Sequence, residues 1–522
     1  MNAFSYFLYF HYFPYTILII SIYNAIINHS LYICQNKKLF IRSSSIIMKK
    51  NNLFLIFFLS VLITQAQQVN YINFKQYFKN KTMRLDYFHT GNSTDEHFAV
   101  DRILSDGQWS GSKNILFDKL NLGPYFYEIY DSETGQMIYS RGFASIFGEW
   151  QTIPEAKERW GTFHESIRFP WPLKPVKLVM KKRNGKNDFV EIWSTEIDPS
   201  KRAINPSDIN PKYKTWTYME NGPASEKLDI VILGDGYTTE EMDKFHKDIE
   251  RLTEKLFDEE PFKTRRSDFN VRAVETPAEE SGVNRPHHGI FKRSPLSVSY
   301  SSFDSQRYAL AYDNRTIRDV ASAVPYDFMY ILINEQTYGG GGIYRLYATV
   351  SVDNKFADYV FVHELGHHLA GLADEYYSSS VSYELHDVTV EPWEPNITAL
   401  FDKENLKWKE LVEDDTPIPT PWDKDRFDEH GIRTQQERQK LRKQNVKEEV
   451  MEEFFDNQKE EETEMISKMK YSGKTGAFEG GGYKQFGLYR PYTDCIMFTR
   501  NKNAFCPVCQ AAINRVIDQY TK

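Results

Sequence analysis

Residues 361–377 read Phe-Val-His-Glu-Leu-Gly-His-His-Leu-Ala-Gly-Leu-Ala-Asp-Glu-Tyr-Tyr. This segment contains the pattern His-Glu-x-x-His, with its histidines at positions 363 and 367. On a helix, side chains four residues apart lie on one face, so His363 and His367 can direct both imidazoles at one point. Two neutral imidazoles are ligands that suit zinc. The segment therefore predicts a helix that carries a metal site.

The residue between the two histidines indicates that the metal is catalytic. Glu364 directly follows the first predicted ligand, so its carboxylate can lie beside the metal without binding to it. From there it can remove a proton from a water molecule whose pKa the metal lowers. A catalytic zinc ion has three protein ligands and keeps its fourth position for water or substrate. We therefore expect one zinc ion and one further ligand after the helix.

The third ligand is predicted to follow a glycine turn. Gly371 can end a helix that begins near Asn354, because glycine tolerates the left-handed backbone conformation. After that turn Asp374 is the preferred ligand, as in the metzincin pattern, in which a glycine turn delivers the last ligand. Here the glycine and the ligand each come one residue later than in the usual spacing. Glu375 and His368 therefore remain alternatives.

A second motif lies near the end of the chain, from Tyr489 to Met497. Met497 is the candidate for a methionine turn, which forms an apolar floor beneath the zinc ligands of metzincins. Tyr489, Arg490 or Tyr492 could donate a hydrogen bond to the oxyanion that forms when water attacks a carbonyl. We expect Tyr492 to be that catalytic donor because it is closest to the turn.

Three cysteines, Cys495, Cys506 and Cys509, follow position 66. In an oxidising compartment we expect one disulfide, from Cys495 to either Cys506 or Cys509, which leaves one thiol unpaired. The pair in Cys506-Pro-Val-Cys509 is alternatively a second metal site or a redox site. Two sulfurs alone are too few for a structural zinc ion.

The first 66 residues are predicted to direct export. A short basic region at 48–52, an apolar run at 53–63 and small residues before position 67 form the three parts of a signal peptide over 48–66. Residues 1–47 are interpreted as an upstream start, with Met48 as the true initiator. The alternative is an N-terminal anchor over 15–27, which is short for a membrane span. The sequence thus predicts a protein that is secreted or periplasmic.

The charge of the exported chain argues against several partners. Residues 1–66 contain five basic and no acidic residues, so their removal changes the net charge from −8 to −13. An acidic protein is a poor candidate for binding nucleic acid or an anionic membrane. No later apolar run is long enough to cross a bilayer. We expect no stable membrane insertion after removal of the signal peptide, and a protein or peptide as substrate.

Composition and turn signals divide the rest of the chain. Residues 69–198 contain predicted strands paired across short glycine-containing loops at 131–135 and 183–187, which indicates an N-terminal β-sandwich. Residues 199–225 are rich in proline and asparagine and are predicted to be a linker. Residues 226–522 form the predicted catalytic domain.

The catalytic domain is predicted to open with a buried strand at 228–233 and a helix over 238–257 that begins with a capping box. A glycine-rich segment at 339–342 leads into a strand at 343–352. That segment is either a loop or part of a substrate-binding edge. Residues 423–470 are highly charged and are interpreted as an insertion of one or two solvated surface helices. The expected fold class is α+β, with a mixed sheet, an active-site helix and a methionine turn.

Three segments together carry a family resemblance: His363 to Tyr377, Ile232 to Thr238, and Tyr489 to Met497. They resemble the IgA-peptidase family of bacterial secreted zinc metallopeptidases, which belong to the metzincin group. The resemblance implies an N-terminal β-sandwich before the catalytic domain. It also implies His363, His367 and Asp374 as zinc ligands and Glu364 as the catalytic acid and base.

The expected function is therefore zinc-dependent hydrolysis of peptide bonds in protein substrates. Two other functions are considered. The first is an exported binding or adhesion protein that uses a peptidase fold as a scaffold; the retained Glu364 argues against it, because a structural zinc site would use a fourth Cys or His ligand. The second is a zinc amidase that acts on peptidoglycan.

Overall fold

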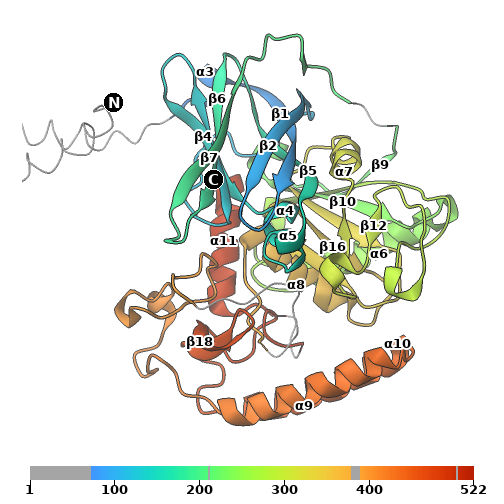
Figure 1. Cartoon of the computed structure of the whole chain (residues 1–522), viewed down its shortest axis with the longest axis vertical. Helices are drawn as coiled ribbons and strands as arrows, with labels where there is room; N and C mark the ends of the chain where they lie inside the picture. Colours follow the sequence, from blue (N-terminus) through green and yellow to red (C-terminus); the bar gives the residue numbers. More distant parts are fainter. Residues whose placement is uncertain (1–71, 210–211, 378–387, 501–503) are drawn as a thin grey trace, which may run out of the picture. The chain divides into compact units, whose positions relative to one another are not determined.

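The computed structural model describes residues 72–209, 212–377, 388–500 and 504–522 (Figure 1). The predicted signal peptide and the segment before it lie outside the described residues. Across the described ranges, no helix is both long enough and apolar enough to cross a membrane. The chain combines helices with several sheets and belongs to the α+β class.

The N-terminal part consists mainly of two four-stranded sheets, with strand orders β5-β1-β2-β8 and β4-β3-β6-β7. Buried side chains from both sheets form one apolar core, including Leu85 of β1 and Leu178 of β6. The predicted strand pairs β3–β4 and β6–β7 are confirmed, and both are antiparallel. The elements are α3 (Phe74–Tyr77), β1 (Phe78–Gly91), β2 (Glu96–Ser105), β3 (Tyr125–Asp131), β4 (Met137–Phe143), α4 (Ile146–Trp150), α5 (Glu155–Glu158), β5 (Gly161–Pro172), β6 (Val176–Arg183), β7 (Phe189–Ile197) and β8 (Ile204–Asn205).

The segment predicted to be a linker contains two strands. Ile204–Asn205 pairs in parallel with β2, and Thr215–Met219 joins the sheet of the catalytic part. In the second strand polar residues alternate with aromatic ones, and the Trp216 ring stacks on His246 with centroids 4.4 Å apart. Alternation of this kind is a strand signal, and the neighbouring prolines and asparagines obscured it.

A six-stranded sheet of order β15-β16-β14-β10-β11-β9 organises the catalytic part. Its four inner strands are parallel, and the edge strands β9 and β15 run antiparallel to their neighbours. The main elements are β9 (Thr215–Met219), β10 (Leu228–Asp235), α6 (Met242–Phe257), β11 (Phe269–Val274), β12 (Val298–Ser299), β13 (Leu310–Ala311), α7 (Asn314–Ala321), β14 (Phe328–Ile333), β15 (Gly340–Ile343), β16 (Tyr347–Ser351), α8 (Ala357–Ala370), α9 (Lys424–Lys443), α10 (Glu448–Ser467), β17 (Phe478–Gly481), β18 (Lys484–Arg490) and α11 (Pro507–Thr521). Short 3-10 helices lie at 224–226, 239–241, 266–268, 286–288, 302–304, 403–405 and 409–411.

The central strand β10 is buried on both faces, as its unbroken apolar run predicted. Ile230 and Ile232 pack in one core with α6, α8 and α11, whereas Val231 and Leu233 pack in another with α7. The predicted capping box is also present: the Thr238 backbone N–H donates to Glu241 Oε2 at 2.8 Å. Both faces of the sheet are thus covered, and α8 lies within the first core.

The glycine-rich segment before the active-site helix is a strand, not a loop. Gly340–Ile343 forms the edge strand β15 and pairs antiparallel with β16. A Cβ atom added to Gly342 would lie 2.3 Å from the Glu364 carbonyl oxygen, which is too close for any other residue. The glycines therefore let the edge strand approach the backbone of α8.

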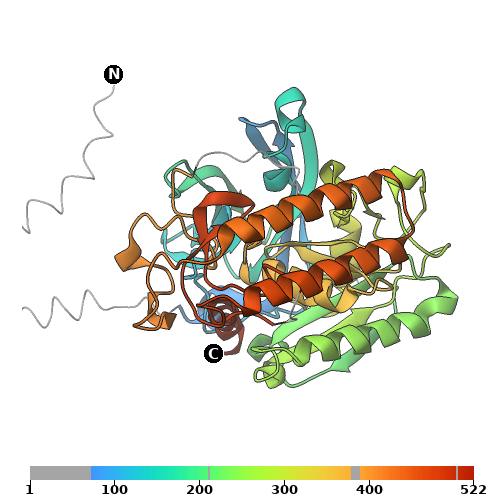
Figure 2. The ribbon, with the colours of Figure 1, turned by 90° about the horizontal axis from the view of Figure 1, so that it is seen from below.

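The charged segment forms a hairpin of two helices, α9 and α10, which lie against each other (Figure 2). The prediction of one or two helices is confirmed, but the interpretation that they are merely solvated is wrong. Phe427, Met451 and Phe455 are buried in the same core as α8. Their apolar face was obscured in the sequence by the many charged residues between them.

Candidate metal centre and active-site pocket

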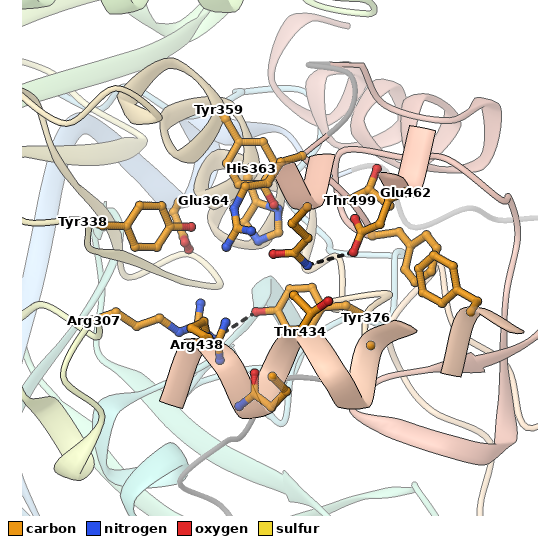
Figure 3. A pocket seen from close by; sticks show the side chains of 16 residues that line it. Arg307, Tyr338, Tyr359, His363, Glu364, Tyr376, Thr434, Arg438, Glu462 and Thr499 are labelled. Carbon is orange, nitrogen blue, oxygen red and sulfur yellow. Dashed lines mark hydrogen bonds between the residues drawn. The ribbon is translucent and has the colours of Figure 1, made fainter. Parts of the chain in front are cut away.

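Helix α8 carries both predicted histidine ligands and the predicted base. His363 and His367 lie one turn apart, and His363 and Glu364 both line the pocket shown in Figure 3. The helix ends at Gly371, whose φ of 60° and ψ of 32° are left-handed, as predicted. The chain then turns back and places Asp374 opposite the two histidines.

Three potential ligand atoms converge at this point. Asp374 Oδ1 lies 3.0 Å from His363 Nε2 and 3.3 Å from His367 Nε2, and the two Nε2 atoms are 3.1 Å apart. The Nδ1 atom of His363 donates to the Ile496 carbonyl oxygen at 2.9 Å, and that of His367 donates to the Leu372 carbonyl oxygen at 2.5 Å. In the neutral rings these bonds leave both Nε2 lone pairs directed at the carboxylate.

Such an arrangement fits a cation. Asp374 Oδ1 is buried and has no hydrogen-bond partner among the described residues. Two lone pairs and a carboxylate oxygen repel one another unless a proton or a metal ion lies among them. Burial lowers the pKa of His367, but the charge of Asp374 outweighs this effect and brings that pKa to about 9. Two imidazoles and one carboxylate are a donor set that zinc accepts.

The structure distinguishes Asp374 from the two alternatives. Both ring nitrogens of His368 are used elsewhere: Nδ1 donates to the Ile343 carbonyl oxygen, and Nε2 accepts the Met329 N–H. Burial lowers the pKa of His368 to about 3, so this ring is neutral. Glu375 points to the opposite side of the chain and lies among three cysteines. Asp374 alone of the three meets both predicted histidine ligands.

Asp374 is held by residues that the sequence did not indicate. The Tyr483 hydroxyl donates to Asp374 Oδ2, and the Gly482 N–H donates to the Asp374 carbonyl oxygen at 2.9 Å. Both donors belong to the turn between β17 and β18. Contacts of this kind orient a ligand and tune its affinity for a metal. Their distance along the chain from Asp374 explains why no local sequence pattern could identify them.

The predicted methionine packs against helix α8. Met497 is fully buried, and a Cβ added to Gly366 of α8 would lie 3.1 Å from its sulfur atom. The Met497 carbonyl oxygen accepts the Glu375 N–H at 2.8 Å. The turn is thus connected both to the helix that carries the histidines and to the segment that carries Asp374.

The structure does not support the predicted catalytic role of Tyr492. Its hydroxyl donates to the Gly473 carbonyl oxygen at 2.6 Å. The buried Arg490 donates to backbone carbonyl oxygens of Glu479 and Gly480. Neither these two residues nor Tyr489 is among the described residues that line the pocket. Closeness to the turn along the sequence did not bring these side chains to the metal centre.

Other donors face Glu364 across the pocket. Arg307, Arg438 and Tyr376 project into it opposite His363 and Glu364 (Figure 3). A guanidinium N–H of Arg307 donates to the Tyr376 oxygen at 3.3 Å, which leaves the phenol proton free to donate. Burial raises the pKa of Glu364, as expected for a carboxylate enclosed in a pocket.

A carboxylate from the N-terminal part also approaches the metal centre. The Tyr308 hydroxyl donates to Glu149 Oε2 of α4 at 2.5 Å. Desolvation raises the pKa of Glu149 to about 7, while His367 and Glu364 both act on it electrostatically. Glu149 precedes Glu364 by more than 200 positions, and no motif surrounds it. The sequence therefore carried no signal for this residue.

The predicted disulfide is absent from the described residues. Cys495, Cys506 and Cys509 are all buried free thiols, and the sulfurs of Cys495 and Cys509 are 3.8 Å apart. A disulfide requires its sulfurs about 2.05 Å apart. The pairing predicted for these cysteines is thus not present in this structure.

Two family models match the chain. The model described as IgA Peptidase M64 matches residues 217–517, and the model described as Peptidase M64 N-terminus matches residues 73–194. The first match spans more than half of the chain and contains His363, Glu364, His367 and Asp374. No curated protein matches the chain. The family resemblance expected from the sequence is confirmed.

Proposed function

The chain belongs to the IgA peptidase M64 family, and from that premise we propose that this metallopeptidase is an exported zinc-dependent endopeptidase of protein substrates. The observation that carries the proposal is the convergence of His363 Nε2, His367 Nε2 and Asp374 Oδ1 beside the half-buried Glu364. Three ligands that approach from one side leave room for substrate and water. A structural zinc site would be closed by a fourth ligand.

His363, His367 and Asp374 would hold the ion. Zinc at this position would supply a Lewis acid that polarises the scissile carbonyl and activates water. The carbonyl oxygens of Ile496 and Leu372 keep the two imidazoles in the tautomer that presents Nε2. Tyr483 holds the carboxylate of Asp374 from behind.

Glu364 is the group that moves the proton. Its carboxylate takes a proton from the attacking water and then passes one to the leaving amine. Burial raises its pKa, which makes the protonated form easier to reach during turnover. Tyr376 replaces Tyr492 as our candidate oxyanion donor, because Arg307 donates to its oxygen and the phenol proton remains available.

Membership of this family also supports an interpretation of the fold of both parts of the chain. The two N-terminal sheets around one core are interpreted as a β-sandwich, and the mixed sheet with α8 and Met497 as a metzincin-like catalytic domain. Export through residues 48–66 remains a prediction from the sequence.

Replacement of the catalytic base tests the mechanism. Glu364→Gln is expected to keep its zinc but to lower kcat on an unfolded protein substrate about 10²–10⁴-fold, because the amide cannot accept the proton. Zinc content and hydrolysis are measured on the full chain, with and without a chelator. Glu240→Gln, which changes an exposed carboxylate outside the pocket, is the matched control and should retain full activity.

The alternatives give different results in this experiment. A scaffold with a binding role would bind zinc but show no hydrolysis in the wild type. A peptidoglycan amidase would release fragments from cell-wall material while leaving proteins intact. Full activity of Glu364→Gln on proteins would exclude the proposed role of this residue.

A further inference from the structure

A second cluster of potential metal ligands lies next to the catalytic centre. It consists of Glu375, Cys495, Cys506 and Cys509, whose ligand atoms all lie within 4.8 Å of one another. All four residues are at most 3% exposed. They come from three separate segments: the turn after α8, the methionine turn and the N-terminus of α11. The fold therefore assembles this cluster from residues far apart in the sequence.

The distances fit one metal ion better than a disulfide. Ligands about 2.3 Å from a tetrahedral zinc ion place two sulfurs about 3.8 Å apart. The Cys495 and Cys509 sulfurs are separated by 3.8 Å. The Cys509 sulfur is 3.4 Å from Glu375 Oε1, close to the separation of about 3.6 Å expected for a sulfur and an oxygen on one zinc ion.

The Glu375 carboxylate is an independent indication that this cluster binds a cation. Glu375 is fully buried, and its Oε2 atom has no hydrogen-bond partner among the described residues. The other oxygen accepts a hydrogen bond from Asn396 Nδ2 at 3.0 Å, which fixes the orientation of the group. Burying a carboxylate among thiols is costly unless a cation compensates it.

A backbone donor and a helix N-terminus lie beside two of the sulfurs. The Cys506 backbone N–H donates to the Cys495 sulfur at 3.4 Å. Cys506 precedes the first turn of α11, where the partial positive charge of a helix stabilises an anion. Cys506 and Cys509 also have the C-x-x-C spacing common among zinc ligands. The sequence showed only these two sulfurs as a pair, and folding adds the third sulfur and the carboxylate.

Zinc is the ion that this set of ligands suits best. Four protein ligands close a tetrahedral site, as in structural zinc sites, and soft thiolates favour zinc over magnesium or calcium. Three thiolates and a carboxylate leave an excess of negative charge around a divalent ion. The buried guanidinium of Arg490 acts electrostatically on Glu375 and offsets part of that charge.

We infer that Glu375, Cys495, Cys506 and Cys509 bind a structural zinc ion separate from the catalytic one. This ion connects the residue next to Asp374, the turn that contains Met497 and the first turn of α11. It thereby holds a catalytic ligand and the floor of the active site against the body of the domain. It also keeps three thiols from oxidising in an exported protein.

Zinc stoichiometry of the purified full chain tests this inference. The wild type should contain two zinc ions per chain. The double variant His363→Ala/His367→Ala should lose only the catalytic ion, and Cys506→Ser/Cys509→Ser only the structural ion. A wild type with a single zinc ion that the histidine variant loses would overturn the inference while leaving the proposed function intact. A wild type with a single zinc ion that the histidine variant keeps would support the structural site and contradict the proposed catalytic zinc.

A spectroscopic measurement identifies the ligands. Cobalt(II) bound to thiolates gives sulfur-to-metal charge-transfer bands in the near ultraviolet. These bands should be present in the cobalt-loaded wild type and in the histidine variant, and absent from the cysteine variant. Ala512→Ser, which adds a hydroxyl to the buried face of the same helix, is the matched control and should keep the bands.

A further experiment needs no cysteine variant and therefore does not depend on folding of the cysteine mutants. A mercurial that binds thiolates should release one equivalent of zinc from the wild type and one from the histidine variant. Alkylation of the denatured, unreduced protein should modify Cys495, Cys506 and Cys509. A disulfide between any two of them, or modification without zinc release, would overturn the inference.

Discussion

Tyr483 couples the metal centre to a turn more than 100 residues away in the sequence. Its hydroxyl donates to Asp374 Oδ2, while Oδ1 of the same carboxylate faces the two histidines. We expect Tyr483→Phe to lower zinc affinity or activity about 10–100-fold, because the loss of an outer hydrogen bond leaves the ligand less well oriented. Zinc affinity is measured by competition with a chelator, and kcat/KM with a peptide substrate.

Tyr489→Phe is the matched control for that change, since Tyr489 belongs to the same hairpin but does not line the pocket. Equal effects of the two substitutions would show that Tyr483 supports the hairpin and not the ligand. Normal affinity with normal activity in Tyr483→Phe would contradict its proposed role.

We expect Arg438 to give the pocket a preference for acidic substrates. It is half-buried opposite Glu364, and it forms no ion pair with a carboxylate among the described residues. A substrate carboxylate could provide that partner. Arg438→Gln is expected to lower kcat/KM about 10–100-fold for peptides with Asp or Glu near the scissile bond, because hydrogen bonds between charged groups contribute about 1.5–3 kcal/mol.

Neutral peptides of the same length should be affected much less by Arg438→Gln. Arg433→Gln on the same helix removes an exposed guanidinium that pairs with Glu461, and it should change neither substrate class. An equal loss for acidic and neutral peptides would show that Arg438 shapes the pocket without selecting charge.

At the scale of single residues, the sequence predicted what depends on local geometry. His363, Glu364 and His367 lie within five residues of one helix, so helical spacing alone brings them together. Asp374 follows after one turn. Tyr492 was favoured because it is close in sequence to Met497, but its hydroxyl donates to the Gly473 carbonyl oxygen. Contacts to residues outside the local segment decide where such a side chain points.

The hairpin of α9 and α10 forms part of the wall of the pocket. Phe427, Gly431 and Glu462 of these helices line the pocket together with Glu364. Polar contacts also hold the hairpin to the start of α8: Glu452 Oε1 accepts hydrogen bonds from Asn354 Nδ2 at 3.3 Å and from the Lys355 N–H at 3.2 Å. We therefore expect a long substrate to displace the hairpin or to pass beneath it on the way to Glu364.

We expect Glu452→Ala to loosen the hairpin and to raise kcat/KM for an unfolded protein about two- to tenfold. The substitution removes hydrogen bonds worth about 1 kcal/mol, which corresponds to a change of this size. A short peptide that fits beneath the hairpin should gain less. Glu453→Ala, at the next and exposed position of α10, is the control. Equal gains for the two substrates, or no gain for either, would contradict a gating role.

At the scale of elements, sequence patterns predicted the type of an element more reliably than they predicted what that element packs against. The apolar run of β10 and the capping box before α6 predicted both elements correctly. The sequence left the glycine-rich segment of β15 undecided between a loop and a substrate-binding edge. Its glycines are required by the close approach of α8 and not by a turn. The hairpin was interpreted as solvated because its apolar positions are sparse among charged residues.

At the scale of the whole molecule, a buried polar network joins the N-terminal part, the active-site sheet and the last helix. Asp118 Oδ2 accepts a hydrogen bond from Arg345 Nη1 at 2.8 Å, and Asp118 Oδ1 accepts one from Gln519 Nε2 at 3.0 Å. Arg345 lies in the turn between β15 and β16, and its backbone N–H donates to the His368 carbonyl oxygen at the end of α8. No motif marked this network, because its members are separated by up to 401 positions.

The stability of the molecule should therefore depend on Asp118 in a way that varies with pH. Burial raises the pKa of Asp118, but Arg345 and Arg141 outweigh that effect and hold the pKa below its usual value. A carboxyl with a depressed pKa in the folded state stabilises it fully above the unfolded-state pKa of about 3.9. That stabilisation is lost as the pH falls through the folded-state pKa.

Asp118→Asn is expected to lower the free energy of unfolding near pH 7 by about 3–5 kcal/mol, because it leaves a buried guanidinium without its charge partner. The difference from wild type should shrink below about pH 4, where Asp118 itself becomes protonated. Urea unfolding followed by tryptophan fluorescence, with chelator present for both proteins, measures the difference at each pH. Glu133→Gln removes an exposed partner of Lys174 and should cost less than about 1 kcal/mol at any pH. A difference for Asp118→Asn that stays constant as the pH falls would show that the carboxyl contributes through packing and not through its charge.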